Sequence, residues 1–218
     1  MKIRVTINLN IGRVVKYFVL VDLFLVAGWG LIDPIFSVFV VNKIPGATLI
    51  TVGIAAGIYW ILKSFLQLPV ARYLDKRPGE RDDFYTLVLG LLIVAASAFG
   101  FVLVRNIWEL YLVQIIKSIG FCLYVASWPA IFSRHLDKEK VSFDWALDST
   151  AVGLSAGISG FLAGVVASRW GYETVFIAGA VLSLISALVL LAAPNLILPP
   201  PNKTKPVMKD HSPINLGR

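Results

Sequence analysis

Six long apolar runs, separated by short polar segments, constrain this 218-residue chain more than any other feature of its sequence. A helix needs about 20 mostly apolar residues to cross a hydrocarbon layer about 30 Å thick. Hydrophobic residues make up 57% of the chain, and a soluble domain of this length has too little interior to bury them. The runs cover residues 15–41, 47–71, 84–104, 107–133, 145–168 and 172–193. We therefore expect an all-α integral membrane bundle of six transmembrane helices.

The segments between the runs have the composition of turns. Proline–glycine pairs stand in the first two breaks, at 45–46 and 78–79. We expect residues 1–14 to form a cytoplasmic N-terminal segment and residues 15–193 to form the six-helix transmembrane bundle. Residues 194–218 are polar and begin with prolines, so we expect a disordered cytoplasmic tail.

Basic residues alternate between the breaks in the way that fixes membrane orientation. Fifteen of the 20 Lys and Arg residues lie in the N-terminal segment, the tail, and the second and fourth breaks with their flanks. The other breaks hold only Lys43, Arg105 and Arg169. Because Lys and Arg stay on the cytoplasmic side, we expect the N- and C-termini of a cell or inner-membrane protein to be cytoplasmic. The net charge of +7 therefore indicates topology, not nucleic-acid binding.

Four ionisable residues fall within the predicted spans: Asp22, Asp33, Lys63 and Lys117. Each costs at least about 2.5–3.5 kcal/mol at the centre of a membrane helix, so we expect each to face protein or a water-filled cavity. Asp22 and Asp33 share one helical face, because 11 residues return to within about 20°. Matching depths predict two acid–base pairs. Asp22 pairs with Lys63 nearer the inside, and Asp33 pairs with Lys117 nearer the outside.

The fourth predicted span places polar and aromatic residues on one face at helical spacing. These residues are Leu110, Gln114, Lys117, Phe121, Tyr124 and Trp128. The pattern predicts a cavity wall, although charges and aromatic rings that only lock the bundle together would give the same pattern. Tyr59, Trp60 and Gln67 near Lys63 are secondary candidates. The predicted substrate-binding residues are Asp22, Asp33, Lys63, Gln114, Lys117 and Tyr124.

Small residues recur every three or four positions along the fifth predicted span, which is typical of close helix packing. The glycines of this stripe are Gly153, Gly157, Gly160 and Gly164. The stretch 153–157 also matches the nucleophile pattern GxSxG, with Ser155 at its centre, so an intramembrane hydrolase is an alternative. That reading lacks a base, because His135 and His211 both lie outside the predicted spans.

Cysteine and histidine content limits the chemistry of the chain. Cys122 is the single cysteine, so no internal disulfide framework is possible, and no Cys/His spacing suggests a metal site. We expect no cofactor, no metal and no enzymatic activity.

The second break carries the clearest family resemblance. Residues 71–81 resemble the signature that the major facilitator superfamily has between its second and third helices: Gly, then Asp, a basic residue, Gly and further basic residues. Asp75 and Lys76 match that pattern, whereas Ala71 stands in place of the first Gly and Gly79 comes about one residue late. Pro34, the glycine stripe of the fifth span and the turn at 169–176 are also similar to that family.

The fourth span departs from the family pattern. Members often have an intramembrane Arg there, with glycines four and six residues later. This chain has Gln114, Ser118 and Gly120 at those places, with Lys117 as the nearest cation.

The resemblance covers residues 15–193 and the N-terminal half of a twelve-helix architecture. It implies two inverted three-helix repeats, with the first and fourth helices lining a cavity near the bilayer midplane. It also implies a conformational gate, for which Asp75, Lys76, Arg81 and Arg134 are the candidates.

A half-sized bundle offers one wall of such a cavity. We expect a secondary transporter that moves a small solute by alternating access as a homodimer or with a second six-helix half, in contact with membrane lipid and not with nucleic acid. A non-transporting membrane scaffold or assembly protein, or a truncated transporter remnant, is the alternative.

Overall fold

The computed structural model describes residues 11–76 and 79–192, and this part of the chain is built from long helices. They are α1 (Arg13–Lys43), α2 (Leu49–Asp75), α3 (Arg81–Leu103), α4 (Ile107–Arg134) and α5 (Val141–Leu191). Each is long and apolar enough to cross a membrane. Most of the predicted N-terminal segment and the whole predicted tail, residues 194–218, lie outside the described residues.

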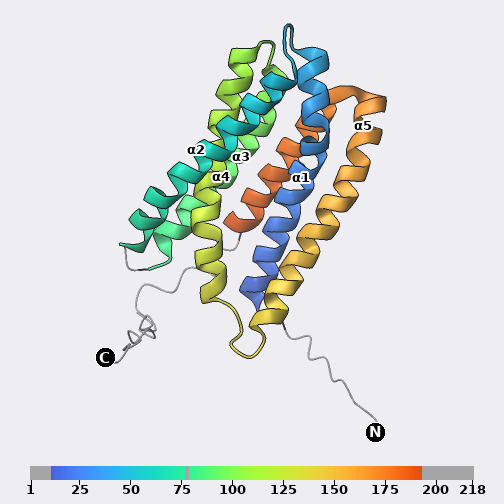
Figure 1. Cartoon of the computed structure of the whole chain (residues 1–218). Coiled ribbons are helices and arrows are strands. Elements are labelled where there is room, and N and C mark those ends of the chain that lie inside the picture. The colour runs from blue at the N-terminus through green and yellow to red at the C-terminus, as the bar shows by residue number, and fades with distance from the viewer. Residues whose placement is uncertain (1–10, 77–78, 193–218) are drawn as a thin grey trace, which may run out of the picture.

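Gly171 divides the 51-residue α5 into two segments. Its φ of 83° and ψ of 173° lie outside the helical region, and glycine adopts a positive φ without a Cβ clash. Figure 1 shows that the chain reverses direction at the orange end of α5 and runs back toward the other end of the bundle, with α1 between the two segments. This reversal is the predicted break between the fifth and sixth spans. The number of membrane crossings stays a prediction.

A capping box at the start of α2 and a capped N-terminus at the start of α4 set helix starts at the predicted breaks. The side chains of Thr48 and Thr51 each accept a backbone N–H of the other at the start of α2. At the start of α4, Asn106 Oδ1 accepts the Glu109 N–H at 3.0 Å, and Glu109 Oε2 accepts the Arg105 N–H at 2.7 Å. These polar side chains satisfy amide groups that a helix leaves unpaired at its N-terminus.

The helices group around α1 and α4. α1 packs mainly against both segments of α5, while α4 packs against α3 and α2, and α3 also contacts α5. In Figure 1, the α1–α2 link, the α3–α4 link and the turn at Gly171 lie at one end of the bundle. The start of α1 and the α2–α3 and α4–α5 links lie at the other end. The basic breaks of the sequence therefore share one end.

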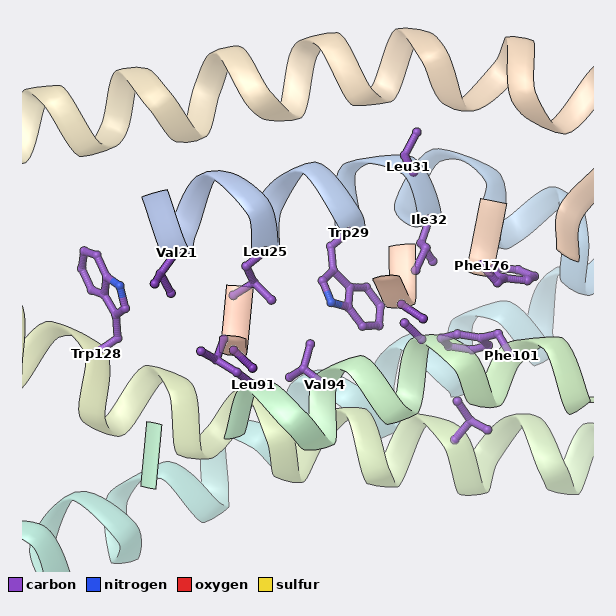
Figure 2. Packing of buried hydrophobic residues seen from close by; sticks show 14 of the residues in the cluster. Val21, Leu25, Trp29, Leu31, Ile32, Leu91, Val94, Phe101, Trp128 and Phe176 are labelled. Carbon is purple, nitrogen blue, oxygen red and sulfur yellow. The ribbon is translucent and has the colours of Figure 1, made fainter. Parts of the chain in front are cut away.

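Buried side chains of α1 interlock with those of α3, α4 and the second segment of α5. Figure 2 shows Val21, Leu25 and Trp29 of α1 pointing toward Leu91 and Val94 of α3. In lipid, apolar burial gives little net drive between helices, so close packing and interhelical hydrogen bonds decide the arrangement.

Serine hydroxyls supply such hydrogen bonds from both segments of α5 to α1. Ser155 Oγ donates to the Leu23 carbonyl at 2.8 Å, and Ser186 Oγ donates to the Val21 carbonyl at 2.7 Å. On α4, Ser118 Oγ lies 3.3 Å from the Tyr59 carbonyl of α2 and 2.6 Å from its own Gln114 carbonyl.

Glycines form the closest backbone contacts, but not the predicted ones. A Cβ on Gly28 of α1 would lie 2.7 Å from the Gly179 carbonyl oxygen of α5. A Cβ on Gly90 of α3 would lie 2.9 Å from the Gly120 carbonyl oxygen of α4. The backbone of α1 therefore packs closely against that of the second segment of α5, and the backbone of α4 packs in the same way against that of α3.

The glycine stripe of α5 faces outward for most of its length. Gly153, Gly157 and Gly164 are exposed, and a Cβ on any of them would meet nothing within 4 Å among the described residues. Gly160 comes closest to a neighbour, 3.8 Å from the Gly30 carbonyl oxygen when a Cβ is added. The predicted packing role is therefore wrong within this bundle for three of the four glycines, because the stripe lies on the side of α5 turned away from α1.

Replacing Gly28 by Ala is expected to destabilise the bundle by about 1–3 kcal/mol, because the new methyl group must push the backbones of α1 and α5 apart. The thermal unfolding midpoint of the purified protein in detergent measures this. Gly164→Ala is the matched control, since an added Cβ there meets nothing within 4 Å among the described residues. Equal midpoints for the two variants would contradict the close contact.

Candidate solute-binding wall

Lys117 is held in an aromatic enclosure near the middle of the bundle. Its Nζ lies 4.0 Å from the ring centroid of Trp29, 4.5 Å from that of Tyr59 and 5.8 Å from that of Phe121. Asp33 Oδ1 lies 3.5 Å from the same ammonium group. The predicted pair between Asp33 and Lys117 is therefore present. Cation–π attraction and the ion pair together compensate for a charge that has left water.

The two members of this ion pair differ in exposure. The side chain of Lys117 is 11% exposed, whereas that of Asp33 is 65% exposed. The pair thus joins the interior of α4 to an open side of α1. An aqueous cavity on that side would hydrate Asp33 but not Lys117.

Lys63 of α2 reaches the same place from another helix. Its Nζ lies 3.8 Å from the ring centroid of Trp60 and 5.2 Å from that of Tyr59, so both lysines contact the Tyr59 ring. Within the described part of the chain, Lys63 has no carboxylate within ion-pair distance, and its charge acts on Lys117. The predicted pair between Asp22 and Lys63 is wrong in this structure.

Asp22 is instead bonded to the fourth helix. It is buried, and the hydroxyl of Tyr124 donates a hydrogen bond to its Oδ1. Asp22 and Lys63 do have similar depths, but depth along an axis does not fix the direction in which a side chain points. Both acids of α1 thus contact residues of α4.

Gln114 lies on the same face of α4 and is buried. Its side-chain Oε1 and the indole Nε1 of Trp29 are buried without hydrogen-bond partners among the described residues. We define the mid-bundle wall as Trp29, Asp33, Tyr59, Lys63, Gln114, Lys117 and Phe121. This face of α4 points into the bundle, with Leu110, Gln114, Lys117 and Trp128 buried, and the cavity wall stays a prediction.

Asp148 is a buried acid that the sequence reading missed. It lies in the first segment of α5, is 7% exposed, acts electrostatically on Asp22 and Tyr124, and has an Oδ1 without a partner in the described structure. The spacing of Asp144 and Asp148, both buried, was the available signal for an inward-facing acidic pair.

The basic end of the bundle carries two further polar contacts. Arg134, the last residue of α4, forms an ion pair with buried Asp83 in the first turn of α3. Beside it, His135 Nε2 lies 2.8 Å from Glu80 Oε2. Together these contacts tie the end of α4 to the start of α3.

The other predicted gate residues are not part of these contacts. Asp75 and Lys76 are exposed at the end of α2, and the described structure gives neither an ion pair. The Arg81 guanidinium is also exposed, with its Cζ 5.8 Å from the ring centroid of Tyr85. The gate role of Arg134 stays a prediction, and its partner Asp83, the last residue before the third predicted span, was not among the predicted gate residues.

Ser155 has a structural role that accounts for its position. Its hydroxyl is committed to the Leu23 carbonyl of α1, and His135 is bound to Glu80 at the end of the bundle. The GxSxG pattern therefore coincides with a serine that joins two helices.

These features define a class of protein: a polytopic membrane bundle with an ionic and aromatic wall at mid-depth and polar contacts at one end. The family model described as Major Facilitator Superfamily matches residues 18–216, and this chain belongs to that superfamily. It is an integral membrane protein of a transporter family, in contact with lipid, and not an enzyme. A search of curated proteins gave no match.

Proposed function

We propose that this chain moves a small solute across the membrane by alternating access, with two six-helix bundles enclosing one central site. The observation that carries the proposal is the mid-bundle wall. An ion pair and a second lysine at the centre of apolar helices are costly, and such residues usually mark a solute or ion path.

The arrangement of helices supports two inverted three-helix repeats. Under such a relation α1 corresponds to α4, α2 to the first segment of α5, and α3 to the second segment. The contact of Gly28 with Gly179 then corresponds to that of Gly120 with Gly90. A serine hydrogen bond also joins each of the two corresponding helix pairs, the first segment of α5 with α1 and α2 with α4, although the donor lies on α5 in the first pair and on α4 in the second.

A second copy of this chain would complete the site by docking on α2 and the first segment of α5. Exposed glycines mark both helices: Gly53 of α2, like Gly157 of α5, has open space where a Cβ would stand. An apolar groove of about 630 Å³ lies between α1 and α5, beside exposed Leu154 and Ile158. A small-residue face next to an apolar groove suits another helix.

The contacts of Arg134 with Asp83 and of His135 with Glu80 are the proposed gate on the cytoplasmic side, where we place both termini from the basic breaks. Asp75, Lys76 and Arg81, exposed in this conformation, are available to contact the second bundle. Such contacts would break and reform as the bundles rock, which is a shift between two packed states.

Cysteine crosslinking in nanodiscs tests the assembly on which this function depends. Cysteine at Gly53 or Gly157 is expected to form a crosslinked dimer, since a side chain added at either position meets nothing within 4 Å among the described residues. Cysteine at Leu89, exposed on α3, is the control that should remain monomeric. Cys122 is replaced in every variant to remove background.

Native mass spectrometry of the unmodified protein gives the oligomeric state independently. A dimer that crosslinks at the glycine positions supports the two-bundle transporter. A persistent monomer, or crosslinking only through Leu89→Cys, would overturn the homodimer and favour a partner half or a scaffold.

A further inference from the structure

The mid-bundle wall carries an excess of positive charge. Lys117 is paired with Asp33, whereas Lys63, which contacts the same Tyr59 ring, has no carboxylate partner within the described residues. Asp22 lies 11 residues from Asp33, about 16 Å along α1, so it does not supply the missing charge. One unit of positive charge is therefore left uncompensated at mid-depth.

Hydrogen-bond donors also exceed acceptors in this region. The ammonium of Lys63 and the buried indole N–H of Trp29 have no acceptor among the described residues, while Gln114 offers one free carbonyl oxygen. A ligand with two acceptor oxygens and one negative charge would satisfy these donors. A carboxylate has this combination.

The aromatic rings of the wall set the rest of the ligand's chemistry. Tyr59 and Phe121 of the wall lie beside the ammonium groups, and Trp60, next to the wall, lies against Lys63. Tyr59 is in edge-to-face contact with Trp60 and Phe121 at centroid distances of 5.1 Å and 5.8 Å. Such rings pack an apolar or aromatic body at little cost in side-chain entropy. A carboxylate without an apolar body, such as formate, would leave these ring faces uncovered.

A cationic ligand fits less well, although the enclosure of Trp29, Tyr59 and Phe121 resembles a site for ammonium ions. Lys117 already occupies that enclosure. A competing cation would have to displace a tethered one and would then face two lysines. An anion, by contrast, leaves Lys117 in place and gives Lys63 a partner.

We infer that Lys63 and Lys117, together with the aromatic rings of the mid-bundle wall, bind a small organic monoanion with an apolar body, such as an aromatic monocarboxylate. This inference rests on the proposed transport function and names the class of solute. Lys63 is the specificity-determining residue, since it is the lysine of the mid-bundle wall that has no carboxylate partner among the described residues.

Isothermal titration of the full chain in phosphatidylcholine nanodiscs tests this directly. Benzoate is the probe, with benzylammonium and benzyl alcohol as the cationic and neutral counterparts. Benzoate is expected to bind and the other two are not. Lys63→Gln should weaken benzoate binding by about tenfold or more, because it removes a charged hydrogen-bond donor.

Lys43→Gln is the matched control, since Lys43 also lies over an aromatic ring, 5.8 Å from the centroid of Tyr172, but at the other end of α1 from the basic breaks. This variant should bind benzoate as the unmodified protein does. Equal binding by the Lys63→Gln variant, preference for benzylammonium, or no benzoate binding would overturn the inference.

Two further arms separate related explanations. Nanodiscs of phosphatidylglycerol present an anionic headgroup to the same lysines. Suppose that the protein binds benzoate in neither kind of nanodisc, and that native mass spectrometry shows a bound phosphatidylglycerol that is lost in the Lys63→Gln variant. The site is then a lipid site, and the inference fails. Benzoate uptake by proteoliposomes is measured separately. Binding without uptake would contradict the proposed transport function but would still support an anion-binding site.

Discussion

Asn in place of Asp33 is expected to destabilise the bundle by about 2–3 kcal/mol, whereas Met in place of Lys117 should cost about 1 kcal/mol or less. The asymmetry follows from exposure. Asp33→Asn leaves a lysine whose side chain is 11% exposed without its counterion, while Lys117→Met leaves a carboxylate that is 65% exposed and still hydrated. Unfolding of the purified variants in detergent, followed by the tryptophan signal, measures both values.

The double variant Asp33→Asn/Lys117→Met supplies the control for this pair. Its loss of unfolding free energy should be smaller than the sum of the losses in the two single variants, because the double variant carries neither charge and so leaves no charge without its partner. If the two single variants are equally stable, or Lys117→Met is the worse, the buried side of this ion pair has been misassigned.

Arg134→Met is expected to destabilise the protein by about 3 kcal/mol, because it leaves Asp83 buried without a cation. Asp83 is 2% exposed, and Arg134 is its ion-pair partner across the α3–α4 contact. Adding Asp83→Leu to Arg134→Met should restore much of the loss, since an apolar side chain suits that buried position. Chemical unfolding of the single and double variants checks the expectation.

Arg81→Met is the matched control for the Arg134 variant. Arg81 is an exposed arginine at the same end of the bundle and contacts the Tyr85 ring, so its replacement should change stability by about 0.5 kcal/mol or less.

The same set of variants tests the proposed gate. In proteoliposomes Arg134→Met should alter uptake, while a large effect of Arg81→Met alone would place the gate elsewhere.

The linear features of the fold could be predicted from the sequence. The runs at 15–41 and 107–133 became α1 and α4 with ends displaced by at most two residues, because apolar length and capping side chains act locally. The turn before the last predicted span became the break at Gly171 for the same reason. The pairing of Asp33 with Lys117 followed from depth alone, since a helix advances a fixed distance per residue.

Contacts that depend on helix rotation could not be predicted in this way. Matching depth suggested Lys63 as the partner of Asp22, but the side chain of Asp22 accepts a hydrogen bond from Tyr124 of α4 instead. The glycine stripe of α5 had the pattern of a packing face, yet the backbone contacts are made by Gly28 with Gly179 and by Gly90 with Gly120. A small-residue pattern says that close approach is possible, not which helix approaches.

The sequence by itself determined the class of protein, the boundaries of the apolar helices and the set of charges that must lie at mid-depth, because hydropathy and the rise of a helix are properties of the chain taken alone. The tertiary structure decided which of those charges meet. It placed Lys117 among the rings of three other residues and paired Asp83 with Arg134. Among the described residues it gave Lys63 no carboxylate partner. The physical reason is that partners across helices depend on axial rotation and neighbour order, which are fixed only when all the helices pack together.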